Sequence, residues 1–382
     1  MDFVKFGIIG CGIAARFHIL GLRNVTNPKY KFIAAHDIDE KVLTRFSKAH
    51  KLTPYNKLED LLQSDIDAAL ILVPHYLHAK ITKAAAQAGK HVLCEKPMAP
   101  TLEECDEMIT VTKKASVKFM IAENHRFLPA HLYIKDLIER DFIGDVFLAN
   151  TYEGAYDDPE HFLNPDIWHF TYDKGGGGVL ADQGAHKFAL LNWLLNDTVD
   201  SAQAWCAKTL NSPPNKGEDS AIIFLRYKKG AIAEITVSTS AIHTPYNATE
   251  LHGTKGSILE DHQWDNPLKI FSSHPDAEIK GFFYSPKKDP PEHGPFPKYY
   301  VISARGEDTH FAECILNNTE PEFTPEQARE AVAVILLGYL SVKRGTLTKM
   351  DELKKVAKKE GTKSILQGLE ELMQKNYENL NW

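Results

Sequence analysis

The first third of the chain alternates short apolar runs with stretches of helical spacing. The run Ile66–Val73 is almost wholly apolar, which is typical of a strand buried on both faces. This alternation predicts a parallel sheet with crossover helices. We predict strands over Phe3–Ile9, Lys31–His36, Ile66–Val73, His91–Cys94 and Val117–Ala122, and helices over Ile13–Val25, Asp39–His50, Tyr76–Ala88 and Leu102–Ala115.

The pattern changes after Gly144, where β-rich runs are joined by short turns. Ser285–Pro297 holds five prolines and predicts an irregular arm or loop, and the charged tail after Asp351 is compatible with helix. We predict strands over Asp145–Tyr152, Ser220–Tyr227, Ala231–Ser240 and Ser257–Asp261, and helices over Ala181–Leu195, Glu307–Leu316 and Pro325–Val342.

These patterns predict two domains in a chain of 382 residues. The first, residues 1–125, is expected to be an α/β Rossmann domain with a doubly wound parallel sheet. The second, residues 126–382, is expected to be an α+β domain with a largely antiparallel sheet.

Composition excludes several function classes. Hydrophobic residues make up 43% of the chain, charged residues 25%, and the net charge is −7, so nucleic acid and anionic membranes are not expected partners. No apolar run is long enough to span a bilayer, and the N-terminus does not resemble an export signal. The five cysteines are scattered and form no C-x-x-C, as in a reduced interior. We therefore expect a cytoplasmic protein.

A glycine-rich turn follows the first predicted strand. Gly10 permits a tight turn, Gly12 lets the backbone approach a pyrophosphate, and the small Ala15 allows close packing of helix on strand. The helix N-terminus at Ile13 and Ala14 offers N–H groups and a positive dipole end to phosphates. Alone, the same turn could serve without any ligand.

An acidic residue, Asp37, ends the second predicted strand, 25 residues after Gly12. Its carboxylate can accept hydrogen bonds from the ribose hydroxyls of NAD and would repel the 2′-phosphate of NADP. The next basic residue is Lys41, so NAD is favoured over NADP as the cofactor.

A second motif, Glu95-Lys96-Pro97, follows another strand, at the sheet edge where doubly wound folds bind ligands. A lysine beside a cationic nicotinamide can hydrogen-bond a substrate hydroxyl, although a lysine after a strand can equally be a solvated surface residue. The Lys96-Pro97 bond could be cis or trans.

A third motif follows four glycines and contains Asp182 and His186. Their spacing of four residues places both side chains on one helix face. A carboxylate beside an imidazole stabilises its protonated form, which suits a general base for an alcohol. The same spacing is also common in ordinary surface pairs.

Taken together and in this order, GCGIAA, GKHVLCEKP and GGGGVLADQGAH resemble the glucose–fructose oxidoreductase / inositol dehydrogenase family (Gfo/Idh/MocA). The likeness extends through Pro74–Ala79 and Asn124–Phe127 and covers essentially the whole chain. One departure is Ala189, where members of the family often have Asp.

The resemblance implies a Rossmann domain that binds NAD(P), and a second domain whose sheet carries substrate and oligomer contacts. It implies Lys96, Asp182 and His186 as the catalytic residues. It implies cofactor contacts from Gly10, Gly12, Ile13, Ala14, Asp37, Pro74, His75, His78, Glu95, Lys96 and Asn124, and substrate contacts from Lys96, Arg126, Tyr156, Trp168, His169, Asp182 and His186.

We therefore expect an NAD-dependent oxidoreductase that oxidises a secondary hydroxyl of a sugar, cyclitol or glycoside bound between the domains. His186 would take the hydroxyl proton, Asp182 would support the imidazolium, and Lys96 would orient the hydroxyl. A homodimer or homotetramer formed through the C-terminal sheet is expected. No metal is expected, although His161, His169, Asp182 and His186 could be imagined as ligands.

Two alternatives stay open. One is a redox-neutral enzyme that retains NAD and cleaves a glycosidic bond or forms an epimer after transient oxidation. The other is a non-enzymatic regulator that binds NAD as a ligand.

Overall fold

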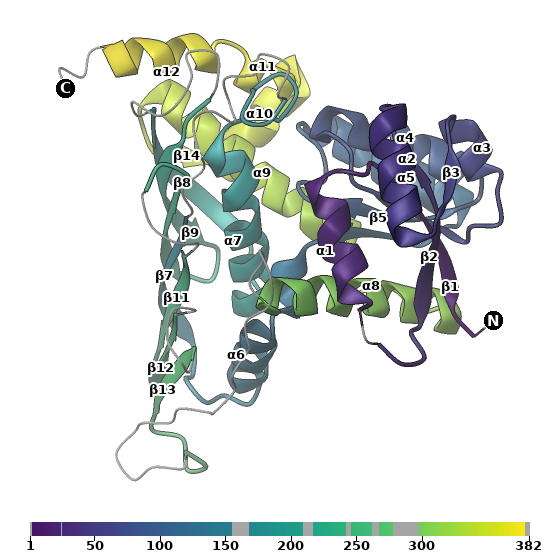
Figure 1. Cartoon of the computed structure of the whole chain (residues 1–382). Coiled ribbons are helices and arrows are strands. Elements are labelled where there is room, and N and C mark those ends of the chain that lie inside the picture. The colour runs from purple at the N-terminus through teal and green to yellow at the C-terminus, as the bar shows by residue number, and fades with distance from the viewer. Residues whose placement is uncertain are drawn as a thin grey trace. The chain divides into compact units, whose positions relative to one another are not determined.

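The computed structural model describes residues 2–23, 25–154, 168–208, 217–241, 246–261, 267–277 and 298–378 (Figure 1). The chain divides into two compact units. Unit 1 comprises Met1–Ala99, Glu103–Pro129 and Pro291–Arg329, and unit 2 comprises Pro100–Leu102, Ala130–Pro290 and Glu330–Trp382. The proline-rich segment Ser285–Pro297 lies outside the described residues.

Unit 1 is built on a six-stranded parallel sheet of order β3-β2-β1-β4-β5-β6. This is the doubly wound order, in which the strand order reverses between β1 and β4 and leaves a crevice at the carboxyl ends of the strands. The strands are β1 (Val4–Ile9), β2 (Tyr30–His36), β3 (Thr53–Tyr55), β4 (Ala68–Ile71), β5 (His91–Glu95) and β6 (Phe119–Ala122); the helices are α1 (Ile13–Gly21), α2 (Glu40–His50), α3 (Leu58–Leu62), η1 (His75–Leu77), α4 (His78–Gln87), α5 (Leu102–Ala115) and η2 (Asn124–Phe127).

A late helix, α8 (Lys298–Asn317), also belongs to unit 1. Phe311 on this helix packs against Phe6 of β1 with ring centroids 6.2 Å apart. A Cβ at Gly21 of α1 would lie 3.1 Å from Arg305, so the two helices approach closely. The structural division therefore differs from a single boundary at residue 125, because the chain returns to cover the first sheet. α8 is also longer than the helix predicted there, Glu307–Leu316.

Unit 2 contains an eight-stranded mixed sheet of order β13-β12-β11-β7-β10-β9-β8-β14. All of its pairings are antiparallel except that of β7 with β10. The strands are β7 (Val146–Gly154), β8 (Val199–Ala207), β9 (Ser220–Tyr227), β10 (Ile232–Ser238), β11 (Tyr246–Gly253), β12 (Gly256–Asp261), β13 (Leu268–Ser272) and β14 (Thr348–Lys349); the helices are α6 (Pro129–Glu139), α7 (Val179–Leu195), α9 (Pro325–Arg344), α10 (Met350–Glu360), α11 (Lys363–Leu366) and α12 (Leu369–Glu378).

The predicted fold class, a parallel Rossmann sheet followed by an α+β unit with a largely antiparallel sheet, is confirmed. Several elements were not predicted, among them β8, β11, β13 and α6. The sequence of β11, YNATELHG, has mixed polarity, and its neighbouring strands determine where it pairs. The predicted helix Ile13–Val25 ends earlier, at Gly21.

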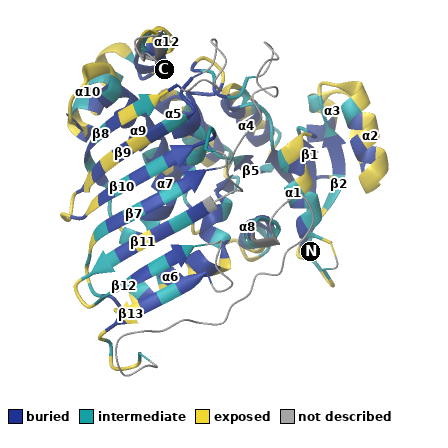
Figure 2. Cartoon of the chain, turned by 60° about the vertical axis from the view of Figure 1, so that its left-hand side comes forward, coloured by how far each residue is buried: buried dark blue, intermediate teal, exposed yellow. Residues whose placement is uncertain are grey.

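The sheet of unit 2 has one covered face and one open face (Figure 2). α7 packs on β10, β7 and β9, and Gly338 of α9 approaches Ile223 of β9. On the other face, alternate residues of β9 are exposed, among them Ile222 and Phe224. This alternation is the period-two pattern of a sheet packed on one side.

Among the described residues, no helix is long and apolar enough to cross a membrane. The five cysteines are free thiols, four of them buried and Cys206 half-buried.

Candidate active site

The glycine turn joins β1 to α1 in unit 1. Gly10 has φ +97°, and a Cβ there would lie 2.5 Å from the Leu72 carbonyl oxygen, so this position requires glycine. A Cβ on Gly12, by contrast, would meet nothing within 4 Å. Gly12 is the N-cap of α1, and no side chain caps the first N–H groups of this helix. The turn therefore presents uncapped helix N–H groups to open space, which suits a phosphate.

Asp37 follows β2 and holds this turn in place. Its Oδ2 accepts a hydrogen bond from the Cys11 N–H at 2.7 Å, and its Oδ1 accepts one from the Asp39 N–H at 2.9 Å. Each carboxylate oxygen keeps lone-pair capacity for a further donor. The side chain thus shapes the turn besides any contact it makes with a ribose.

The segment after β4 carries three predicted cofactor contacts: Pro74, His75 at the start of η1 and His78 at the start of α4. His78 is fully buried, with Nε2 2.9 Å from the Val73 carbonyl oxygen and Nδ1 3.0 Å from that of Pro97. Burial lowers the pKa of His78, although the carbonyl contacts oppose this. His78 therefore connects the loop after β4 to the loop that follows β5.

Lys96 follows directly after β5, at the carboxyl edge of the sheet. Its N–H donates to Oε2 of Glu95 at 3.0 Å, and the Lys96-Pro97 peptide bond is cis. The side chain of Glu95 is 23% exposed, so the predicted Glu95-Lys96 motif lies at an accessible edge of unit 1.

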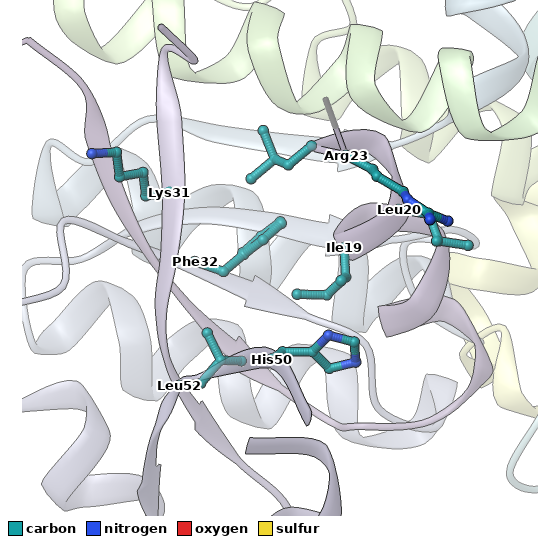
Figure 3. Close-up of a pocket in the computed structure, with 8 residues that line it drawn as sticks. Ile19, Leu20, Arg23, Lys31, Phe32, His50 and Leu52 are labelled. Carbon is teal, nitrogen blue, oxygen red and sulfur yellow. The ribbon is translucent and has the colours of Figure 1, made fainter. Parts of the chain in front are cut away.

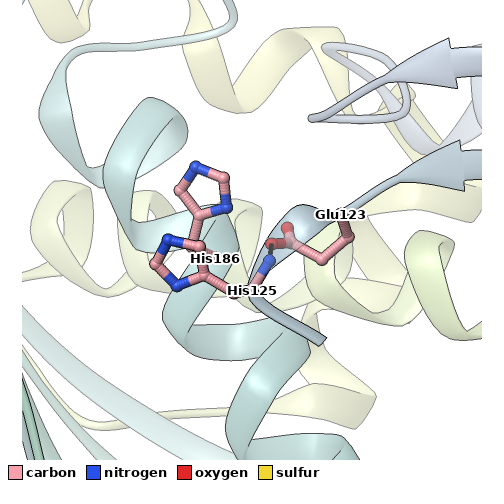
Figure 4. A group of neighbouring side chains, drawn as sticks. All are labelled: Glu123, His125 and His186. Atoms are coloured by element: carbon pink, nitrogen blue, oxygen red, sulfur yellow. Dashed lines mark hydrogen bonds between the residues drawn. The ribbon is translucent and has the colours of Figure 1, made fainter. Parts of the chain in front are cut away.

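The residues after β6 form η2, where Asn124 and Arg126 were predicted ligand contacts. Glu123 and His125 are buried, and the His125 N–H donates to Glu123 Oε1 at 3.3 Å (Figure 4). The amide of Asn124 donates to Ser303 Oγ of α8 at 3.0 Å. This end of unit 1 is thus built by β6 and α8 together.

Arg126 is 4% exposed. Its Nη1 donates to the Glu322 carbonyl at 3.2 Å, and its guanidinium lies 4.4 Å from the centre of the Phe323 ring. Burial lowers the pKa of Arg126 to about 10. These contacts give Arg126 a structural role within unit 1, and its predicted substrate contact stays a prediction.

In unit 2, α7 carries the predicted acid and base. The helix is largely buried, including Gly184, Ala185 and Lys187, whereas Asp182 and His186 are half-buried. Asp182 and His186 are therefore accessible on a helix of which most residues are buried. The four-residue spacing predicts this arrangement, and Figure 4 shows His186 extending from the helix.

A buried carboxylate anchors the start of α7. Glu218 accepts hydrogen bonds from the hydroxyls of Tyr172, at 2.6 Å, and Tyr339, at 2.7 Å, and from the Leu180 N–H at 3.1 Å. Burial raises the pKa of Glu218, while these hydrogen bonds oppose the rise. A Cβ on Gly177 would lie 1.9 Å from the Tyr339 hydroxyl, so glycine is required where the tyrosine meets the turn. We call Glu218, Tyr172 and Tyr339 the α7 anchor.

The sequence did not reveal this anchor, because its members are 167 residues apart at the extremes and share no motif (339 − 172). Of the predicted substrate wall, the rings of Trp168 and His169 stack with centroids 3.8 Å apart in unit 2. Tyr156 and His161 lie outside the described residues.

Unit 1 also has a pocket of about 530 Å³ at the end of α1 and along β2 (Figure 3). Apolar side chains such as Ile19 and Phe32 line it, together with Arg23 and His50. None of the predicted site residues contributes to this pocket.

Comparison with known proteins decides the family. The family model described as "Oxidoreductase family, NAD-binding Rossmann fold" matches residues 4–123, and the model of the GFO/IDH/MocA C-terminal domain matches residues 131–259. The chain belongs to the Gfo/Idh/MocA family. The resemblance drawn from its three motifs is confirmed, and so are its assignment as an oxidoreductase and NAD as its cofactor.

Individual relatives match most of the chain. An uncharacterized oxidoreductase, YrbE, of Bacillus subtilis is 29% identical over 92% of this chain and 98% of its own length. A myo-inositol 2-dehydrogenase of Thermotoga maritima is 25% identical over 89% of this chain and 96% of its own. A solved levoglucosan dehydrogenase, in complex with NADH and levoglucosan, shares the fold with a TM-score of 0.80 at 21% identity, over 91% of this chain and 99% of its own.

The residues of unit 1 fit NAD. A Cβ on Gly12 would meet no atom within 4 Å, which leaves room for a pyrophosphate at the uncapped start of α1. Asp37, directly after β2, is a hydrogen-bond acceptor. The loops after β4 and β5 complete the carboxyl edge of the sheet.

Proposed function

We propose that this oxidoreductase oxidises a secondary hydroxyl of a sugar, cyclitol or glycoside with NAD⁺. NAD⁺, when bound, supplies the hydride acceptor. The chain supplies positioning and proton transfer, and Lys96, Asp182 and His186 are assigned to these tasks.

His186 is the proposed general base. It removes the proton from the hydroxyl oxygen as hydride leaves the carbon that bears this oxygen. Asp182, one helical turn earlier, stabilises the imidazolium that results. Lys96 donates a hydrogen bond to the reacting oxygen and favours its deprotonated form. The alcohol loses one proton and one hydride in total, so the products are a ketone, NADH and a proton.

One observation carries this proposal. Most of α7 is buried, yet its Asp182 and His186 are half-buried and share a face, and the α7 anchor fixes the start of their helix. An acid and a base that share one face of a helix held in this way are suited to proton transfer. The substrate class is supported by the inositol and levoglucosan dehydrogenases among its relatives.

A substrate screen tests the function. We expect inositols, aldoses or simple anhydrosugars to give NADH absorbance at 340 nm with NAD⁺, and a weaker signal with NADP⁺ because Asp37 repels the 2′-phosphate. Mass spectrometry should find the matching ketone. A preference for NADP⁺ would remove the selective role of Asp37.

The same screen separates the two alternatives. Cleavage or epimerisation of a glycoside without net NADH would indicate a redox-neutral enzyme that retains its cofactor. NAD binding without turnover of any polyol would indicate a regulator.

We further propose that the protein is a cytoplasmic homodimer or homotetramer associated through the open face of the unit 2 sheet. Trp205 and Phe224 are 55% and 46% exposed there, with ring centroids 5.9 Å apart. Ile222 and Ile232 extend this apolar surface across β9 and β10. Apolar surfaces of this kind mark association sites.

Charge introduced on this face is expected to dissociate the oligomer. In size-exclusion chromatography with light-scattering detection, the double variant Trp205→Asp/Phe224→Asp should have the mass of a monomer, 42.9 kDa. The wild-type protein should give a multiple of that mass. Leu132→Asp on α6, a helix outside this sheet face, is the matched control because Leu132 is 46% exposed. A monomeric wild-type protein would refute the proposed association.

A further inference from the structure

A histidine in the interior of unit 1 lies between two carboxylates. His18 belongs to α1 and is 1% exposed. Its Nδ1 is 2.9 Å from Oδ1 of Asp308 on α8, and its Nε2 is 3.5 Å from Oε1 of Glu95 at the end of β5. The ring therefore connects the helix of the glycine turn, the late helix α8 and the glutamate that precedes Lys96.

The contacts of this ring indicate that it carries both protons. A neutral imidazole would direct a lone pair at one of the two carboxylates, whereas an imidazolium donates to both. Burial alone would lower the pKa of His18, but Asp308 and Glu95 outweigh it and raise the pKa well above the ordinary value.

A further acid adjoins the ring. Glu307 is 1% exposed, and its Oε2, like Oδ2 of Asp308, has no hydrogen-bond partner among the described residues. Burial and the neighbouring carboxylates, including Glu123, raise the pKa of Glu307 well above its usual range. The titratable or charged groups around His18 are thus Asp308, Glu307 and Arg305 of α8, Glu95 of β5, Glu123 directly after β6, and Tyr30 of β2.

Glu95 links this group to the proposed active site. Its Oε1 faces His18, while its Oε2 accepts a hydrogen bond from the backbone N–H of Lys96 at 3.0 Å. We propose that His18 is a positioning residue: held by Asp308, its ring fixes the Glu95 carboxylate that accepts the Lys96 N–H, and thereby orients Lys96. This inference rests on the proposed function, which assigns Lys96 to the reacting hydroxyl.

Charge explains why Glu95 depends on this ring. Without a cation at His18, the carboxylates of Glu95 and Asp308 would repel each other across a low-dielectric interior. Glu95 is 23% exposed, so its side chain can turn toward water. The hydrogen bond from the Lys96 backbone N–H would then be lost, and the turn that carries the lysine would lose this support.

The protonation state can be tested without any substrate. In ¹⁵N spectra of the full chain, the ring signal that is absent from His18→Gln should show two protonated nitrogens at pH 8, well above the ordinary histidine pKa of about 6.5. If His18→Gln does not fold, the signal that shifts in Asp308→Asn identifies the same ring. A neutral ring at pH 8 would overturn the inference, as would a stoichiometric divalent cation in metal analysis of the purified protein, because the atoms of His18, Glu307 and Asp308 lie within 4.8 Å of one another.

Kinetics test the coupling to Lys96. His18→Gln should lower kcat by roughly 10²-fold, the effect of a misplacement of about 1 Å, with little change in NAD⁺ affinity. Asp308→Asn should lower the pKa of the ring, so the alkaline limb of the kcat profile should move down by about one pH unit or more. In the double variant His18→Gln/Asp308→Asn, the downward movement of the alkaline limb should be absent, because no ring remains to titrate. Glu307→Gln, a neighbouring change that keeps His18, Asp308 and Glu95, is the control and should behave like wild type.

If His18 had a purely structural role, its replacement would lower the stability of the protein and the size of kcat. Asp308→Asn would then leave the pH dependence of kcat unmoved. An unmoved profile in folded Asp308→Asn, or a displacement that persists in the double variant, would refute the coupling. Failure of the proposed function is distinguishable: Lys96→Ala would then keep full turnover, while the ring spectrum would still show a doubly protonated His18.

Discussion

Replacement of His186 by Asn is expected to lower kcat for polyol oxidation by about 10²–10⁴-fold, the usual contribution of a general base. Asn keeps similar size and polarity at this accessible position of α7 but cannot accept the hydroxyl proton. NAD⁺ affinity should stay close to wild type, because the residues predicted to bind the cofactor lie in unit 1. Initial rates of NADH formation and a fluorescence titration with NADH measure the two quantities.

The control is a second histidine of unit 2. His252 of β11 contacts Ser257 at 2.9 Å and has no proposed part in catalysis, so His252→Asn should keep wild-type turnover. Lys96→Ala should give a loss comparable to that of His186→Asn, and Lys83→Ala, which removes an exposed ion pair with Glu107, should not. Intact turnover in both His186→Asn and Lys96→Ala would show that the chemistry lies elsewhere.

Removal of the α7 anchor is expected to have the largest effect on stability. Glu218→Ala leaves the buried hydroxyls of Tyr172 and Tyr339 and the Leu180 N–H without their acceptor. Removing one partner from a buried, hydrogen-bonded polar group lowers the free energy of unfolding by about 3–5 kcal/mol. Chemical denaturation followed by fluorescence and circular dichroism measures this loss.

Turnover should fall in the same variant, because the start of the helix that carries Asp182 and His186 loses its anchor. An exposed glutamate of the same unit, Glu250, provides the matched control, and Glu250→Ala should change stability by less than about 0.5 kcal/mol. If Glu218→Ala were as stable as Glu250→Ala, the anchor would not hold the helix.

The sequence predicted the features that depend on local chemistry. Gly10 must be glycine because of its own φ and its neighbour Leu72. The apolar run Ile66–Val73 predicted an interior strand, and the buried strand β4 covers its centre, Ala68–Ile71. The spacing of Asp182 and His186 likewise determines that they share a helix face. Elements such as β11, whose sequence YNATELHG has mixed polarity, were not predictable, because β7 and β12 on either side determine its pairing.

By itself, then, the sequence determined the class of the two units and predicted the turn proposed to bind the cofactor and the residues proposed for proton transfer. Only the tertiary structure decided what holds them. Asp308 reaches His18 across 290 positions of the chain, and Glu218 meets Tyr339 across 121. Such contacts leave no periodic pattern, because a buried carboxylate is stabilised by partners that the fold brings together and not by its neighbours in sequence.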